Sequence, residues 1–289
     1  MLKILIEPLQ YEFMQRSLII AIIVGIICAV VGSYLMVQRL ALLGDAISHS
    51  VLPGLAIAFI LDINIFIGAF VAGLISTVCI NIIRNNSKIK EDAAMGIVFS
   101  AFFALGITLI TVVQKENKID LNHFLFGNIL GVSLSDVKDT IIIAIFVLLI
   151  VILFYKELLF YTFDKLGAKS VGLPVNLLDT GLMILIGLTI VASLKAVGVI
   201  LVLSLLITPA CTAYLLVNRL HEVMILGVFF GVISSISGMY LSYYFNLPSG
   251  PAIVLVATLF FIITFLFSPN HGLITGFLKL KYNQIKFLN

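Results

Sequence analysis

Long uncharged runs of apolar residues are the feature that most limits how this 289-residue chain can fold. About 20 consecutive apolar residues are needed to cross the hydrocarbon core of a membrane. The sequence predicts an all-α integral membrane protein with about nine membrane-spanning helices, within a range of eight to ten. The nine runs lie at 17–37, 40–61, 65–83, 93–113, 140–155, 178–192, 197–217, 222–245 and 251–268.

The composition supports lipid as the main solvent of these helices. Hydrophobic residues make up 62% of the chain and charged residues only 11%, whereas a soluble domain is about half apolar and about a quarter charged. The net charge of +3 is not gathered into a basic block, so nucleic acid is not an expected partner. The three cysteines stand alone in apolar runs, which predicts neither a disulfide framework nor a thiolate metal site.

The domain organisation expected from these runs is simple. Residues 1–16 mix apolar and charged residues and are expected to form an interfacial segment without a cleavable signal. Residues 17–268 form the transmembrane domain, which includes a cytoplasmic loop at 156–177. Residues 269–289 form a cytoplasmic tail.

The orientation follows from the positions of lysine and arginine. If the loop 84–92 is cytoplasmic, eleven of the 17 basic residues lie inside and six outside, as the positive-inside rule requires. The outer segment 120–135 is apolar but short and interrupted by glycine, so it is expected to be a re-entrant or surface helix.

Two polar side chains interrupt the second run. Asp45 is the only carboxylate well inside any run, because Asp179 and Glu222 fall at the ends of theirs, where water is expected to reach them. His49 is the only histidine inside a run. A carboxylate at the centre of a spanning helix costs about 2.5–3.5 kcal/mol on insertion scales, and such residues mark substrate or ion pathways by default.

The spacing of the pair suggests what it could hold. Asp45 and His49 are four residues apart, so they share one helix face. One carboxylate and one imidazole suit a divalent ion such as Mn²⁺, Zn²⁺ or Fe²⁺. A proton relay and a purely structural hydrogen bond remain open alternatives. Pro53 should kink the same helix, and two copies of the chain in a homodimer would double the number of ligands.

Four segments resemble the bacterial ABC-type metal-ion permeases of the manganese, zinc and iron class. They are GDAISHSVLPG at 44–54, LFGNILGVS at 125–133, FDKLGAKSVGLP at 163–174 and VGVILVLSLLITPACTA at 197–213. They occur in family order over about residues 10–268, and the overall likeness is greatest to manganese permease subunits of Gram-positive bacteria.

This resemblance implies a fold, a location and partners. The chain would be one half of a homodimer similar to the type II ABC importers, embedded in membrane lipid of the bacterial plasma membrane. Two cytoplasmic ATPase subunits and an extracytoplasmic solute-binding lipoprotein would complete the complex. Asp45 and His49 would bind the ion, and the segment that couples to the ATPase would comprise Phe163, Asp164, Ala168, Gly172, Leu173 and Pro174.

The expected function is therefore that of the permease subunit of an ATP-driven importer of divalent metal ions, with manganese preferred. The alternatives are zinc or iron as the ion, or a secondary transporter driven by an ion gradient. The chain has no G-x₄-G-K-[ST] loop, so it is not expected to be an enzyme and a separate subunit would hydrolyse ATP. No cofactor is expected in the chain; the bound ion, Mn²⁺ or Zn²⁺, would be cargo.

Overall fold

A computed structural model describes residues 6–113, 129–269 and 272–274, and within these ranges the regular structure is entirely helical. Two short 3₁₀ turns occur at Pro8–Gln10 and Ile129–Gly131. The α-helices are α2 (Glu12–Val37), α3 (Ala41–Ser50), α4 (Leu52–Ile60), α5 (Ile65–Asn86), α6 (Glu91–Val113), α8 (Leu134–Leu153), α9 (Tyr155–Phe163), α10 (Lys165–Ser170), α11 (Val175–Val197), α12 (Val199–Tyr214), α13 (Leu220–Phe245) and α14 (Ser249–Phe267).

The expected multi-pass architecture is confirmed. In the described ranges, seven helical segments are long and apolar enough to cross a membrane, with α3 and α4 counted as one, and the bent pair α8–α9 brings the number to eight. The shorter α12, with 16 residues, matches the remaining run. Each of the nine predicted runs thus has a helix or a helix pair.

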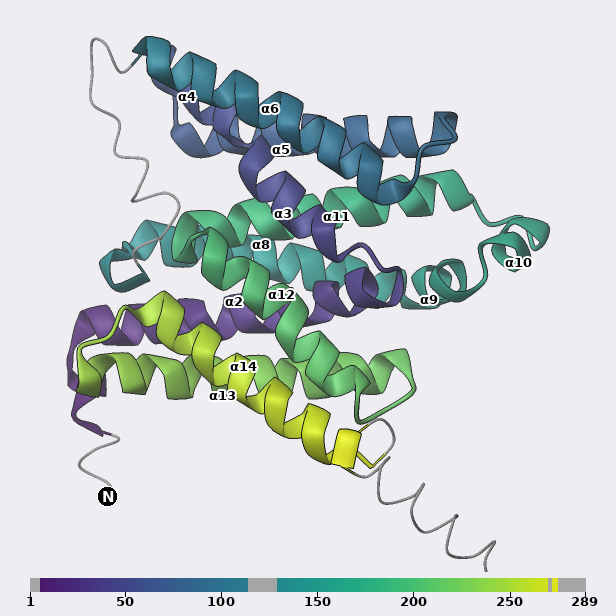
Figure 1. Cartoon of the computed structure of the whole chain (residues 1–289). Helices are drawn as coiled ribbons and strands as arrows, with labels where there is room; N and C mark the ends of the chain where they lie inside the picture. The colour runs from purple at the N-terminus through teal and green to yellow at the C-terminus, as the bar shows by residue number, and fades with distance from the viewer. Residues whose placement is uncertain (1–5, 114–128, 270–271, 275–289) are drawn as a thin grey trace, which may run out of the picture.

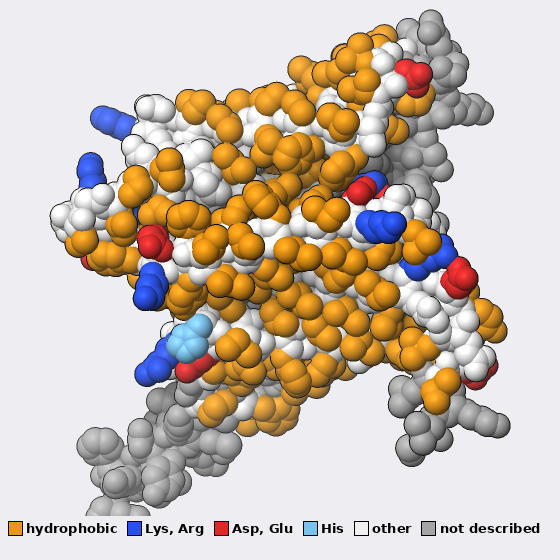
Figure 2. All heavy atoms as spheres, turned by 180° about the vertical axis from the view of Figure 1, so that it is seen from behind, with side chains coloured by type: hydrophobic (Ala, Val, Ile, Leu, Met, Phe, Trp, Pro, Cys, Tyr) orange, Lys and Arg blue, Asp and Glu red, His pale blue; other side chains and the backbone are white. Residues whose placement is uncertain are grey.

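α2 and α11 occupy the middle of the bundle. α2 packs against α12 and α13 on one side and against α8 and α11 on the other, and α14 covers α12 and α13 (Figure 1). α11 also contacts α5, which joins the group α4, α5 and α6 to the rest. A broad apolar surface separates two ends that carry the charged side chains (Figure 2), as expected of helices that span a membrane.

The beginnings of two helices, α2 and α8, differ most from the expected bounds. α2 starts at Glu12, with Arg16 Nη2 2.5 Å from Glu12 Oε2 across one turn, so the last residues of the expected interfacial segment belong to the first long helix. α8 starts at Leu134 because Ser133 and Asp136 form a capping box that satisfies its first turn. Most of the segment 120–135 lies outside the described residues.

The expected kink at Pro53 is confirmed as a break between α3 and α4. Pro53 is the second residue of α4, a position where its missing N–H is not needed. α4 then lies directly against α5 because Gly54 and Gly68 face one another. A Cβ atom on Gly54 would lie 2.0 Å from the carbonyl oxygen of Gly68, so the contact requires glycine on both helices.

Candidate metal-transit site and the segment at 163–174

The structure brings Asp45 and His49 together on one face of α3. Oδ1 of Asp45 lies 3.5 Å from Nε2 of His49, and their side chains are 52% and 24% exposed. This is longer than an ordinary N–H···O hydrogen bond. It is close to the ~3.4 Å that separates two ligands held ~2.1 Å from one ion at a tetrahedral angle. The two atoms can therefore share a cation without moving apart.

Two aromatic rings of α6 hold the imidazole in place. The rings of Phe99 and Phe103 meet His49 edge-on, with centroids 5.5 and 5.6 Å away. Nδ1 of His49 is buried and has no hydrogen-bond partner in the described part of the chain. The orientation of His49 is thus set by packing on α6, with Nε2 directed towards Asp45.

Asp45 lines a small cavity that could not be inferred from the sequence. The cavity is about 110 Å³ in volume and lies between α3 and α6, where Asp92, Met95 and Phe99 also line it. Asp92 belongs to the first turn of α6. The sequence shows Asp92 only as part of the charged connection 84–92. The spacing of residues along one helix does not indicate that Asp92 lies near Asp45 on another helix.

The pair does not form a complete coordination site within one chain. Among the described residues there is no group of three or more histidine, cysteine, aspartate or glutamate side chains that could hold a metal ion. An ion at Asp45 and His49 would need further ligands from water or from a second copy of the chain. Few ligands suit an ion that must leave again.

The residues of the segment 163–174 build one short helix and its two ends. The Asp164 side chain caps α10 by accepting the backbone N–H of Gly167 at 2.8 Å. After the helix, Gly172 has φ +88° and the N–H of Leu173 donates to the carbonyl of Ala168 at 3.0 Å, which is a Schellman end. Pro174 then precedes the first turn of α11.

The same segment divides into a buried and an exposed face. Ala168 is fully buried within the chain, so it fixes α10 against the bundle instead of facing a partner. Phe163, Leu166 and Val171 are 60%, 82% and 71% exposed. Leu166 and Val171 lie within the segment 163–174 but are not among the six residues expected to couple to the ATPase. They were missed because only the folded helix shows which side chains point outwards.

The sequence of the chain matches a known transporter family over most of its length. The model of the ABC 3 transport family matches residues 10–268. The chain belongs to the ABC 3 transport family. This membership confirms the expected class of ABC importer permease and the multi-pass location in the bacterial plasma membrane.

Individual members of the family match nearly the whole chain. The manganese transport system membrane protein MntC of Listeria monocytogenes is 50% identical, over 92% of this chain and 94% of that protein. The chelated iron transport system membrane protein YfeD of Yersinia pestis is 43% identical, over 92% and 88%. The solved structure of PsaBC from Streptococcus pneumoniae in complex with Fab aligns with a TM-score of 0.84 at 44% identity, covering 97% of this chain and 100% of that chain.

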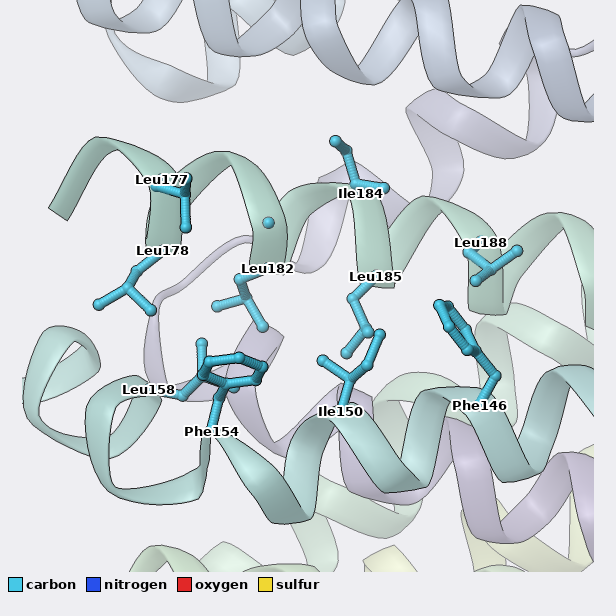
Figure 3. A pocket seen from close by; sticks show the side chains of 11 residues that line it. Phe146, Ile150, Phe154, Leu158, Leu177, Leu178, Leu182, Ile184, Leu185 and Leu188 are labelled. Carbon is cyan, nitrogen blue, oxygen red and sulfur yellow. The ribbon is translucent and has the colours of Figure 1, made fainter. Parts of the chain in front are cut away.

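A larger groove in this ABC 3 family chain differs in character from the cavity beside Asp45. It is about 280 Å³ in volume, lies between α8 and α11, and is lined by residues such as Phe146, Ile150, Leu182 and Leu185. Figure 3 shows these apolar side chains facing one another across the groove. None of its lining residues is ionisable, so it offers no ligand to a cation and is not the candidate site.

One acidic residue lies in a different environment from the one expected. Asp179, near the start of α11, was expected to be reached by water, but its side chain is only 8% exposed. Arg84 and Tyr161 both donate hydrogen bonds to it. The expectation was wrong because the position of a residue near the end of an apolar run says nothing about which helices cover it.

Proposed function

We propose that this chain is the transmembrane permease subunit of an ATP-driven importer of divalent metal ions, with manganese as the preferred ion. The observation that carries the proposal is the pairing of a carboxylate oxygen and an imidazole nitrogen 3.5 Å apart inside a membrane-spanning permease. Oxygen and nitrogen donors without thiolates suit Mn²⁺. The manganese transport system protein MntC, at 50% identity, supports this ion.

The proposed complex contains two copies of this chain, two cytoplasmic ATPase subunits and an extracytoplasmic solute-binding lipoprotein. The solute-binding protein delivers the ion at the outer end, and the ion pauses at Asp45 and His49. ATP binding and hydrolysis in the separate ATPases then move the segment 163–174 and open the pathway to the other side. The chain itself performs no hydrolysis and needs no resident cofactor.

Iron is the alternative ion that a specific observation favours, because YfeD, named for chelated iron transport, is 43% identical. Zinc is a second alternative, since carboxylate and imidazole also serve Zn²⁺. The donor types do not separate these ions.

The complex reconstituted in proteoliposomes tests both the energy source and the ion. Radioactive Mn²⁺ should accumulate only when ATP is supplied to the ATPases, and unlabelled Mn²⁺ should compete better than Zn²⁺ or Fe²⁺. Uptake driven by a pH gradient without ATP would contradict the ATP-driven importer. Stronger competition by Zn²⁺ or Fe²⁺ would overturn the preference for manganese.

A further inference from the structure

A buried polar network joins three helices at the end of the molecule that carries α9 and α10 (Figure 1). Asp179 of α11 accepts hydrogen bonds from Arg84 of α5 and from the hydroxyl group of Tyr161 of α9. Asn85 donates to the same carboxylate at 3.3 Å. We call these four residues the Arg84 network.

The burial of Arg84, Asp179 and Tyr161 separates this network from an ordinary surface ion pair, although its fourth member, Asn85, is exposed. The side chains of Arg84 and Asp179 are only 6% and 8% exposed, and Tyr161 is completely buried. A surface pair contributes little because water screens it. In a buried network, by contrast, removing one partner leaves an uncompensated charge away from water. The helices that share such a network must therefore move together or exchange all their partners at once.

The network also extends towards the candidate metal site. Nη1 of Arg84 is buried and lies 3.7 Å from Oε1 of Glu91, the first residue of α6. The next residue, Asp92, lines the cavity beside Asp45. Further along the same helix, Phe99 and Phe103 pack against His49. α6 thus links the Arg84 network to both residues of the pair, through a contact between Arg84 and a Glu91 side chain that is 43% exposed.

At its other end the network touches the segment proposed to meet the ATPase. Tyr161 lies in the last turn of α9, two residues before the exposed Phe163. Its hydroxyl group is the contact from α9 to Asp179. A displacement of α9 and α10 would therefore act on the Tyr161–Asp179 hydrogen bond and, through Asp179, on Arg84 and α5.

We propose that the Arg84 network is a positioning element that links movement of α9 and α10 to α6 and so to the imidazole of His49. This inference rests on the proposed function, because it assigns a role in ATP-driven transport. Its members touch neither the ion nor ATP. They determine whether a cycle of hydrolysis in the ATPase changes the site where the ion pauses.

The direct test is the number of ions imported per ATP hydrolysed by the reconstituted complex. Tyr161→Phe removes one oxygen atom and leaves the ring in place. We expect this ratio to fall about fivefold or more, the usual size of coupling between two sites. Binding of Mn²⁺ to the purified complex should stay unchanged, because Asp45 and His49 are untouched.

A matched control exists in the same bundle. Tyr34 of α2 is as buried as Tyr161, but its hydroxyl group has no hydrogen-bond partner in the described part of the chain. Tyr34→Phe should therefore leave the ratio of ions to ATP unchanged. An equal fall in both variants would contradict the inference, because loss of any buried hydroxyl would then have the same effect.

A second variant separates coupling from folding. Arg84→Gln combined with Asp179→Asn removes both buried charges, so no buried unpaired charge remains to prevent folding; Glu91 loses a partner but is 43% exposed to water. This double variant should assemble with the ATPase and hydrolyse ATP, yet import few ions per ATP.

Two results would overturn the inference. The first is a normal ratio of ions imported to ATP hydrolysed in both Tyr161→Phe and the double variant. The second is failure of both variants to assemble, which would make the network a folding element. If the unaltered complex imports no divalent cation, the proposed function fails and the inference falls with it. If the unaltered complex imports the ion and the variants import as many ions per ATP as it does, only the inference about the Arg84 network fails.

Discussion

His49 is held more firmly than its partner in the candidate site. The ring of His49 packs edge-on against Phe99 and Phe103. The Asp45 side chain, by contrast, is 52% exposed and lines a cavity. A ligand fixed by packing keeps its geometry before the ion arrives, which lowers the cost of binding. An exposed carboxylate can follow the ion as it enters or leaves. If the pair binds the ion as proposed, it would combine one fixed and one movable ligand.

Phe103→Ala tests whether packing holds the imidazole. Loss of an edge-on aromatic contact costs about 0.5–1.5 kcal/mol, so KM for Mn²⁺ uptake should rise about two- to tenfold. Phe261→Ala is a suitable control, because Phe261 stacks on Phe265 within α14. Equal KM values in the two variants would show that Phe103 does not position His49.

The sequence could predict the pair but not its surroundings. Asp45 and His49 stand out because ionisable residues are rare inside apolar runs, and their spacing places them on one face. Asp92 and Asp179 gave no comparable signal, since both lie near the ends of runs where charge is ordinary. Their roles depend on which helices meet there, and spacing along one helix carries no information about that.

At the scale of helices, close backbone contacts hold together the bundle around α3, the helix that bears the pair. Gly54 of α4 and Gly68 of α5 bring two backbones together, and Gly32 of α2 meets the backbone of Leu206 of α12 in the same way. Small residues at such contacts are the usual means of packing helices in a membrane, where apolar burial gives little driving force between helices.

Gly54→Ala should push α4 away from α5. The added methyl group would lie 2.0 Å from the carbonyl oxygen of Gly68, and such overpacking costs about 1–3 kcal/mol. Thermal unfolding of the detergent-purified protein should show a lower midpoint. Gly181→Ala is the control, because a Cβ there has nothing within 4 Å and alanine favours a helix by about 0.5–1 kcal/mol. Equal stability of the two variants would refute this account of the contact.

The exposed apolar face of α10 gives a prediction about assembly. Leu166→Ala removes a side chain that is 82% exposed and so contributes little to packing within the chain. If the ATPase covers this side chain, its association should weaken roughly tenfold, as for a central contact of an interface. Ile152→Ala, at a side chain of α8 that is 74% exposed, should have no effect. Unchanged copurification of the ATPase with the Leu166 variant would exclude α10 as the docking surface.

The helices were more predictable than the connections between them. Each long apolar run became a helix or a pair of helices, because the backbone must satisfy its own hydrogen bonds in lipid. The loop 156–177, by contrast, holds two further helices, and α8 turns into α9 through a bend of 69°. The cap at Asp164 and the turn at Gly172 are local features that a motif can mark. The direction in which α9 leaves α8 depends on packing.

At the scale of the whole molecule, the candidate site, the Arg84 network and the exposed apolar end lie in different parts of the helix bundle. The group α4, α5 and α6 supports the candidate site, α9 and α10 present exposed apolar side chains at one end, and the Arg84 network lies between them. In the proposed site, one chain would supply two ligands, Asp45 and His49. A second copy related by a two-fold axis would supply two more, which is the simplest way to complete the coordination of one ion.

ATP-dependent uptake of radioactive Mn²⁺ by the reconstituted complex, compared between the unaltered chain and the variants Asp45→Asn and His49→Gln, tests the central claim most directly. Both variants keep the size of the side chain, so they should insert, assemble with the ATPase and retain ATP hydrolysis. We expect uptake of Mn²⁺ to be lost in each, because neither remaining ligand can hold the ion alone. Uptake at the unaltered rate in either variant would contradict the assignment of Asp45 and His49 as the transit site.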